Sequence, residues 1–507
     1  MFPLRTLTVA LAVALASGCT MIPEYQRPAA PVPASFPVVT LPVTAETAPA
    51  DAAEAVSANP AEAAPADAVE AKPAIAPEAA PADTAATAPA DTIAWIDYFA
   101  DARLREVIAL ALANNRDLRV AALNIEQARA QYRIRRADLF PAVGATGSQN
   151  AQRLPDDLTS SGEADVTRVY SATVGFSAYE LDFFGRIRSL KAGALETYLG
   201  TEEARRSAQI SLVAEVANAW LILAFDRERQ ALARSTLETR QKSHDLTRRS
   251  FEAGAVSELD LHQSQTLLQS ARADLARYTT FVAQDENALA LVAGSAVPAA
   301  LLPDTLTDTV SAIAELPAGI PSDVLTRRPD ILQAERNLRA ANASIGAARA
   351  AFFPRITLTA AAGTASSTLD GLFGGDSGTW NFLPQIRIPI FEAGRLKANL
   401  DVAEVQRDIN IARYEQAIQG AFREVADALA ERATLAERLD ARRLQLDATQ
   451  ASFRLADARY RGGVDSYLGL LDAQRTLYLA EQELIAVRLI DAANRVALYK
   501  VLGGGWR

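Results

Sequence analysis

The chain repeats its own plan once, and this repeat limits the possible folds more than any single motif does. Three glycines of the first half recur in the second half at a constant offset of 209 residues (394 − 185). The motif aromatic-x-x-Gly-x-x-Ser-x-Leu-x-Leu occurs at 251–261 and again at 460–470. A repeat of this length indicates one body with two similar halves, at 93–300 and 301–507. The paired glycines are Gly185 and Gly394, Gly254 and Gly463, and Gly294 and Gly503.

Each half contains a long stretch without helix breakers. Residues 186–251 contain no proline and are rich in Ala, Leu, Glu, Gln and Arg, which favour helices. At 1.5 Å per residue this segment predicts a rod of roughly 100 Å. Such a rod is typical of a coiled coil, a spacer or a tube wall, so we expect helical hairpins at 186–294 and 393–502. An apolar stripe at helical spacing follows the second hairpin: Phe422, Val425, Leu429, Ala433, Ala436 and Leu439.

The charge distribution argues against nucleic-acid binding. The net charge is −10, but residues 41–92 carry nine acidic residues and one lysine, so the body that follows is close to neutral. It has no basic stripe of the kind that nucleic acids require. His244 and His262 are interpreted as surface helix residues rather than metal ligands. The motifs GxxxxGKS/T, HExxH and GxSxG are missing, so we expect no enzyme, no metal site and no cofactor.

The N-terminus has the features of a bacterial lipoprotein signal peptide, expected at 1–18. Arg5 precedes an apolar run at 7–16, which is too short to span a bilayer. Small residues then precede Cys19, the sole cysteine, and this pattern resembles a lipobox. A lipid on Cys19 would anchor the mature N-terminus in the membrane. The alternative is an ordinary signal peptide with a chance cysteine.

Two further segments separate this cysteine from the body. Residues 19–40 form a proline-containing, extended lead-in. Residues 41–92 consist of Ala, Pro and acidic residues and lack the large apolar side chains that folding needs, so we expect a disordered linker. A tether between lipid and body and a tolerated insertion are both consistent with it.

Four stretches change from a helical period to a period of two, and we expect strands there, at 142–153, 168–182, 355–366 and 379–391. Prolines at 141 and 354 end the preceding helices, because proline closes a helix. Alternating apolar and polar residues are typical of a membrane-crossing strand with one lipid face and one wet face; a soluble sheet is the alternative. The apolar positions of the second strand are Tyr170, Ala172, Val174, Phe176 and Ala178.

The number of strands predicts an oligomer if these strands cross a membrane. Four strands cannot close a membrane barrel, and an open edge in lipid would leave backbone groups unpaired. The smallest barrels need about eight strands. Several chains would therefore have to share one barrel. Trp380, at the start of the fourth strand, is the best candidate for an interfacial aromatic residue.

Taken together, these features resemble the TolC-type outer-membrane efflux ducts, and most closely the lipoprotein branch typified by OprM. The similarity covers the body from about residue 93 and the first 31 residues, but not the 41–92 insert. The stretches that carry it are Asn115–Asn124, Tyr132–Pro141, Arg327-Arg-Pro-Asp330, Tyr460-Arg-Gly-Gly-Val-Asp465, Leu471-Asp-Ala-Gln-Arg475 and Leu502-Gly-Gly-Gly-Trp506.

This resemblance implies a mixed helix and strand membrane protein in the outer membrane. It implies a homotrimer with a twelve-stranded barrel, continued into the periplasm by a long helical tunnel. It also implies passive export of drugs and similar compounds, together with a periplasmic adaptor and an inner-membrane pump of the resistance-nodulation-division type.

The turns between the long helices are the part of the chain where we expect contacts with partner proteins. Gly254, Gly462, Gly463 and Val464 would form the tip where adaptor and pump dock. In a threefold tube, each residue near this tip would occur once per chain, and the three copies would form a ring. A ring of carboxylates would favour cations. The simpler interpretations are a helix N-cap for Asp465 and a solvated helix face for the others. The expected gate residues are Asp465, Leu455, Asp457 and Arg459.

Two alternatives to the efflux duct share parts of this pattern. A type I protein-secretion duct would have the same architecture, and the lipobox and lead-in argue against it. A non-conducting periplasmic coiled-coil scaffold would have the same helices, and the alternating strands argue against it.

Overall fold

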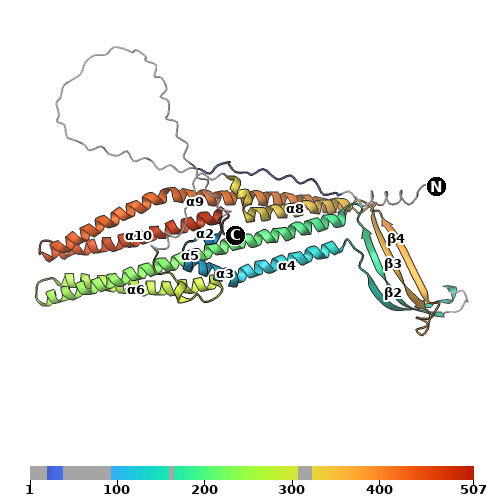
Figure 1. Cartoon of the computed structure of the whole chain (residues 1–507), viewed down its shortest axis with the longest axis horizontal. Helices are drawn as coiled ribbons and strands as arrows, with labels where there is room; N and C mark the ends of the chain where they lie inside the picture. The colour runs from blue at the N-terminus through green and yellow to red at the C-terminus, as the bar shows by residue number, and fades with distance from the viewer. Residues whose placement is uncertain (1–19, 38–92, 159–164, 307–321, 507) are drawn as a thin grey trace, which may run out of the picture.

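The computed structural model describes residues 20–37, 93–158, 165–306 and 322–506. Long helices form a rod, and a curved four-stranded sheet continues it at one end (Figure 1). The helices are α2 (Trp95–Tyr98), α3 (Ala102–Asn114), α4 (Arg116–Ala137), α5 (Arg186–Glu252), α6 (Glu258–Ala293), α8 (Pro329–Ala350), α9 (Arg395–Arg461) and α10 (Tyr467–Val501), with short 3-10 turns η2 (Asp156–Leu158), η3 (Ala299–Leu301) and η4 (Ser322–Arg327). The strands are β1 (Gly144–Leu154), β2 (Asp165–Leu181), β3 (Arg355–Ser366) and β4 (Gly378–Arg387).

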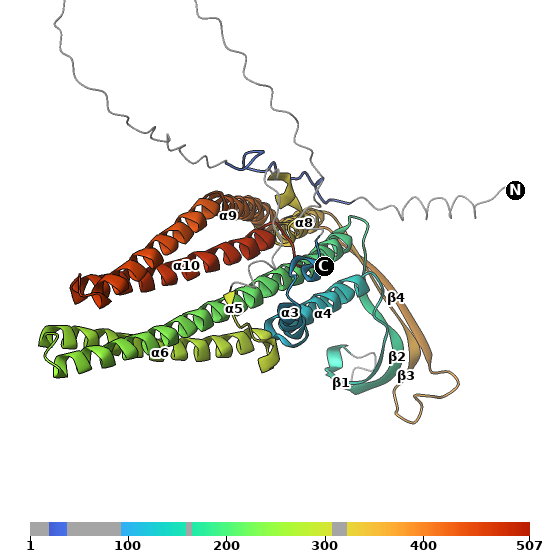
Figure 2. The ribbon, with the colours of Figure 1, turned by 60° about the vertical axis from the view of Figure 1, so that its left-hand side comes forward.

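The two long hairpins are built alike. Helices α5 and α9 are each 67 residues long, and they pack against α6 and α10 respectively. Figure 2 separates the two hairpins. At the tip of each hairpin, one glycine with a positive φ makes the turn: Gly254 at 74° and Gly463 at 71°. A side chain is strained in this left-handed region, so glycine ends both helices there.

The core lies around the middle of the rod, where the short helices cover α5. Trp220 of α5 is fully buried, and its indole Nε1 donates to the carbonyl of Leu301 at 3.0 Å. Tyr98 stacks on Tyr499 of α10 with ring centroids 3.9 Å apart. This aromatic cluster joins the first and last helices of the described body, so the two halves meet in this core.

The sheet is antiparallel in the order β1-β2-β3-β4, so β1 and β4 form its two edges. Its two faces differ in chemistry because opposite residues share a face. One row across the sheet is apolar and consists of Ala145, Val174, Ala362 and Trp380. The adjacent row is small and polar and consists of Thr146, Thr173, Gly363 and Thr379.

The alternation expected for the second strand fails at Ala178. A β-bulge shifts the register between Phe176 and Tyr179, and Ala178 takes a φ of 53°. The bulge inserts one residue, so Tyr179 rather than Ala178 continues the apolar face. The fourth strand also differs from its expected range of 379–391, because it ends at Arg387. Pro389 lies two residues further on and cannot donate a ladder hydrogen bond.

Two carboxylates, the buried Asp226 of α5 and the half-buried Asp285 of α6, lie together between these helices. Asp226 is only 7% exposed, and it lies beside Asp285, with Arg229 Nη1 3.6 Å from its Oδ1. Within the described chain, Asp226 Oδ1 and Asp285 Oδ2 accept no hydrogen bond. Burial, reinforced by the charge of Asp226, raises the pKa of Asp285 to about 6. The pair is therefore most stable when it holds a proton.

This shared proton gives a prediction about pH. The folded pKa of Asp285 lies above its ordinary value of 3.8, so its contribution to stability is largest below that value and is lost as pH rises to about 6. Asp285→Asn should raise the thermal unfolding midpoint near pH 7.5 and have little effect near pH 4. Glu286→Gln on the same helix, which removes an ion pair with Arg227, is the matched control and should not raise it. Equal stabilisation of Asp285→Asn at both pH values would contradict the shared proton.

The hairpin turn gives a second prediction. Gly463→Ala should weaken the local stability of the tip by about 1–2 kcal/mol, because an L side chain is strained at this φ. The neighbouring Gly462 has a φ of −80°, so Gly462→Ala should cost clearly less. Hydrogen–deuterium exchange of residues 455–470 measures both effects. Equal protection in the two variants would show that the backbone conformation does not hold the turn.

Candidate functional site

The hairpin tips bring the predicted docking residues to one end of the rod. Gly254 lies in one turn, and Gly462, Gly463 and Val464 lie in the other. All four are exposed, and the two turns lie at the end of the rod opposite the sheet (Figure 1). Ser257 caps the first turn with its hydroxyl and Asp260, which form a capping box. The turns therefore present backbone and small side chains, a surface on which another protein can pack.

Asp465 forms the strongest contact at the second tip. Arg459 Nε donates to its Oδ2 at 2.5 Å, and Arg459 Nη2 donates to its Oδ1 at 2.9 Å. This bidentate contact crosses the turn, and it holds the pKa of Asp465 below its usual range. The expected N-cap role of Asp465 is wrong: the N-cap of α10 is Ser466. The carboxylate instead neutralises an arginine of the preceding helix.

The other predicted gate residues separate into two groups. Leu455 precedes Arg459 by one helical turn, so it lies on the same face as the Arg459–Asp465 pair. Its side chain is 65% exposed in the single chain. Asp457 lies on another face and pairs with Arg461 at 3.0 Å. Sequence reasoning missed Arg461, although its spacing of four residues from Asp457 on a helix was a usable signal.

The histidines were expected at the helix surface, and this is right for only one of them. His262 is exposed beside Glu258. His244 is half-buried, and its Nδ1 lies 2.8 Å from the hydroxyl of Ser264, which joins α5 to α6. Across the described ranges, no group of three His, Cys, Asp or Glu side chains is arranged to hold a metal ion.

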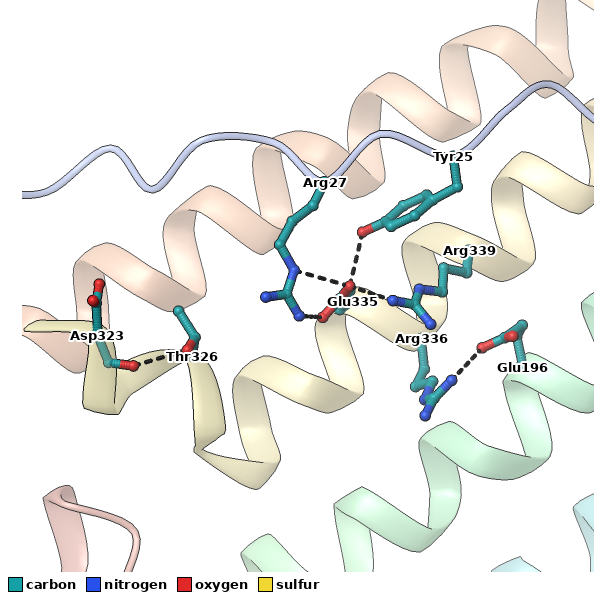
Figure 3. A network of polar contacts seen from close by, with 8 residues as sticks. All are labelled: Tyr25, Arg27, Glu196, Asp323, Thr326, Glu335, Arg336 and Arg339. Atoms are coloured by element: carbon teal, nitrogen blue, oxygen red, sulfur yellow. Dashed lines mark hydrogen bonds and ion pairs between the residues drawn. The ribbon is translucent and has the colours of Figure 1, made fainter. Parts of the chain in front are cut away.

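An extended segment, residues 20–37, lies along α8 and is termed the strap below. Figure 3 shows Tyr25 and Arg27 pointing from the strap onto Glu335 of α8. Arg27 forms a bidentate ion pair with Glu335, the Tyr25 hydroxyl donates to it at 3.1 Å, and Arg339 donates at 2.7 Å. Sequence reasoning missed this network, because its partners are 308 residues apart.

The Glu335 carboxylate is the centre of this attachment. It is only 3% exposed, and burial alone would raise its pKa, but the hydrogen bonds and charges of Arg27 and Arg339 together lower it. The carboxylate therefore stays ionised at neutral pH and holds both arginines. Close packing continues toward the sheet, where a Cβ on Gly346 would lie 2.6 Å from Ile22 Cγ1.

The strap is also held at its other end. Phe36 stacks on Phe422 of α9 with ring centroids 4.8 Å apart. The carbonyl of Ala34 accepts a hydrogen bond from the backbone N–H of Ser322 at 3.1 Å. The predicted signal peptide, Cys19 and the 41–92 linker lie outside the described residues. The strap begins at residue 20, directly after Cys19 in the sequence.

Comparison with known proteins identifies the fold. The family model of the outer membrane efflux protein matches residues 107–295 and 320–504. Two relatives from Pseudomonas putida, the toluene efflux pump outer membrane protein TtgC and the antibiotic efflux pump outer membrane protein ArpC, are each 49% identical over 500 residues, which cover 99% of this chain and 95% of each relative. The crystal structure of the open state of the MtrE outer membrane channel from Neisseria gonorrhoeae superposes with a TM-score of 0.78 at 36% identity, over 96% of this chain and 99% of that one.

The family match covers both halves of the body, and the relatives extend over nearly the whole chain. The long hairpins and the sheet are thus those of an efflux channel. The chain belongs to the outer membrane efflux protein family and is an outer-membrane efflux duct.

Proposed function

We propose that three copies of this chain form the duct, with a twelve-stranded barrel in the outer membrane and a helical tunnel in the periplasm. The observation that carries the proposal is the sheet with two open edges, β1 and β4, at the end of the long helices. Lipid offers no hydrogen bonds, so these edges must pair with other strands. Because the four strands alternate in direction, β4 of one copy can pair antiparallel with β1 of the next.

The two faces of the sheet support the same arrangement. Trp380 on the apolar face is 78% exposed in the single chain, and Phe382 and Ile386 of the same strand are exposed beside it. These side chains suit lipid, whereas the threonines of the opposite row suit a wet lumen. The sheet therefore has the chemistry of one third of a barrel wall.

The strap supports a lipid anchor on Cys19. Its first residues lie near the sheet end of α8, where Ile22 packs against Gly346. A lipid on the preceding cysteine would enter the membrane beside the barrel, and the ion pairs of Glu335 would connect it to the wall. Covalent lipid is the only non-protein group in this proposal.

The partners follow from the family and from the position of the tips. We infer that the exposed turns at Gly254 and at Gly462, Gly463 and Val464 dock a periplasmic adaptor and, through it, an inner-membrane pump of the resistance-nodulation-division type. Transport through the duct is passive and needs no catalytic residues of this chain. The cargo we assign is small organic molecules, including solvents and antibiotics, in line with the names of TtgC and ArpC.

The barrel can be tested by cross-linking. Ser148 on β1 and Asn381 on β4 both lie on the polar face of the edge strands, so Ser148→Cys with Asn381→Cys should give dimers and trimers with a short bismaleimide in outer membranes. The matched control is Ser171→Cys with Ala365→Cys, which face each other inside one sheet and should link within one chain. Either single variant should give monomer. Equal amounts of intermolecular product from the control pair would refute the shared barrel.

The gate can be tested by freeing its carboxylate. Arg459→Gln should leave Asp465 unpaired, and three bare carboxylates at the tip should increase the preference for potassium over chloride by at least about twofold. Asp465→Asn should shift the preference in the opposite direction. Reversal potentials in planar bilayers under a salt gradient measure both. Arg461→Gln, which frees Asp457 on the other face, is the control. An equal shift of the preference for potassium over chloride in this variant would show that Asp465 has no special role.

A further inference from the structure

A polar groove of 780 Å³ lies beside the helices that lead from the sheet to the middle of the rod. Four helices form its walls, and the lining is made of small and polar side chains with two arginines. The residues that matter for its chemistry are Gln131 and Arg135 of α4, Asn337 of α8, and Gln406, Asn410 and Arg413 of α9.

The packing order shows that this groove is the concave side of a curved layer. Helix α4 packs against α5, α5 against α8, and α8 against α9. A row of helices that all contribute to one groove must curve around it. In a tube, the concave side of the wall faces the axis. This step rests on the proposed trimeric duct, in which the groove becomes part of the lumen.

The position of the strap, together with the proposed lipid anchor, supports the same assignment. It contacts α8 through Glu335, Asn342 and Gly346, whereas Asn337 and Ser344 of the same helix line the groove. At 100° per residue these two sets fall on opposite sides of α8. A strap that leads to a lipid anchor has to run outside the barrel, so the groove lies inside.

The two arginines give the groove a positive charge. Arg413 is exposed, and within the described residues it has no acidic partner. Arg135 is exposed as well and has one acidic neighbour, Asp138, at 3.7 Å. The other lining residues are uncharged, and in a trimer six guanidinium groups would surround one level of the lumen. Amides and hydroxyls between them add hydrogen-bond donors, while Ala, Ile and Leu side chains leave apolar surface for a ring or chain.

We propose that this groove is a lumenal binding site for organic anions, in which Arg413 and Arg135 hold a carboxylate or sulfonate and the small apolar residues hold the organic body. A guanidinium presents paired N–H donors that match such groups. The site lies downstream of the tip, so it would take up anionic cargo after the gate and lower its return to the periplasm. Solvated arginines bind reversibly, which a duct requires.

The test uses purified full-length protein in detergent and pyranine, a pyrene that carries three sulfonates. Pyranine binding is followed by fluorescence anisotropy at low salt, because charge interactions between exposed groups are screened within about 10 Å at 0.1 M salt. The variant with Arg135→Gln and Arg413→Gln should bind at least about tenfold more weakly, since each charge-assisted contact contributes strongly. Asp138→Asn should tighten binding, because it frees Arg135.

The matched control is Arg349→Gln. This arginine of α8 pairs with Glu404 of α9 at 3.8 Å and is not among the groove residues. Its loss removes one positive charge, as each of the two groove substitutions does, but should leave pyranine affinity within about twofold. Equal weakening in the control would show non-specific attraction and overturn the proposal. So would unchanged binding in the double arginine variant.

Conductance of the same proteins in planar bilayers separates this inference from the proposed function. If the pores conduct but bind pyranine independently of the two arginines, the proposed duct stands and the proposed anion site in the groove is rejected. Arginine-dependent binding by a protein that forms no pores would reject the duct and with it the lumenal position of the groove. Pores whose block by pyranine weakens in the double variant would support both.

Discussion

The unpaired backbone along β1 and β4 is the constraint on which the rest of the structure depends. Both strands have neighbours on one side only, and in a bilayer each unpaired N–H or C=O group is costly. The four strands of the described residues cannot remove this cost by themselves, because they are too few to close into a barrel. In the trimer proposed above, copies of the chain supply strand edges of matching length and direction.

The helices share that constraint because they continue the same wall. The sheet leads directly into α5 and α9, each of which begins after a glycine in the left-handed region. In the tube proposed above, two hairpins of nearly equal length would fill equal sectors, which is consistent with the repeat in the sequence. The buried cluster that contains Tyr98, Trp220 and Tyr499 packs the two halves against each other at the middle of the rod.

The sequence predicted local structure well and distant partners poorly. The glycine pairs and the prolines marked the turns and helix ends, because a positive φ and a missing N–H are properties of single residues. The bulge at Ala178 was not predictable from an alternating pattern, since one inserted residue depends on the strand opposite. The partner of Asp465 lies six residues back across a turn, so the carboxylate was assigned to the N-cap instead of to Arg459.

The strap shows how a distant contact can decide the role of a helix. Glu335 binds two arginines, and only one of them, Arg339, lies on its own helix; without Arg27 from the strap the buried carboxylate would lose part of its compensation. Helix α8 is therefore held from outside at Glu335, while Asn337, two residues further on, faces the groove. In the proposed duct, less than one turn of α8 separates the contact with the strap from the lumenal groove. In that arrangement the attachment of the strap at Glu335 and the lining of the groove at Asn337 depend on the same helix.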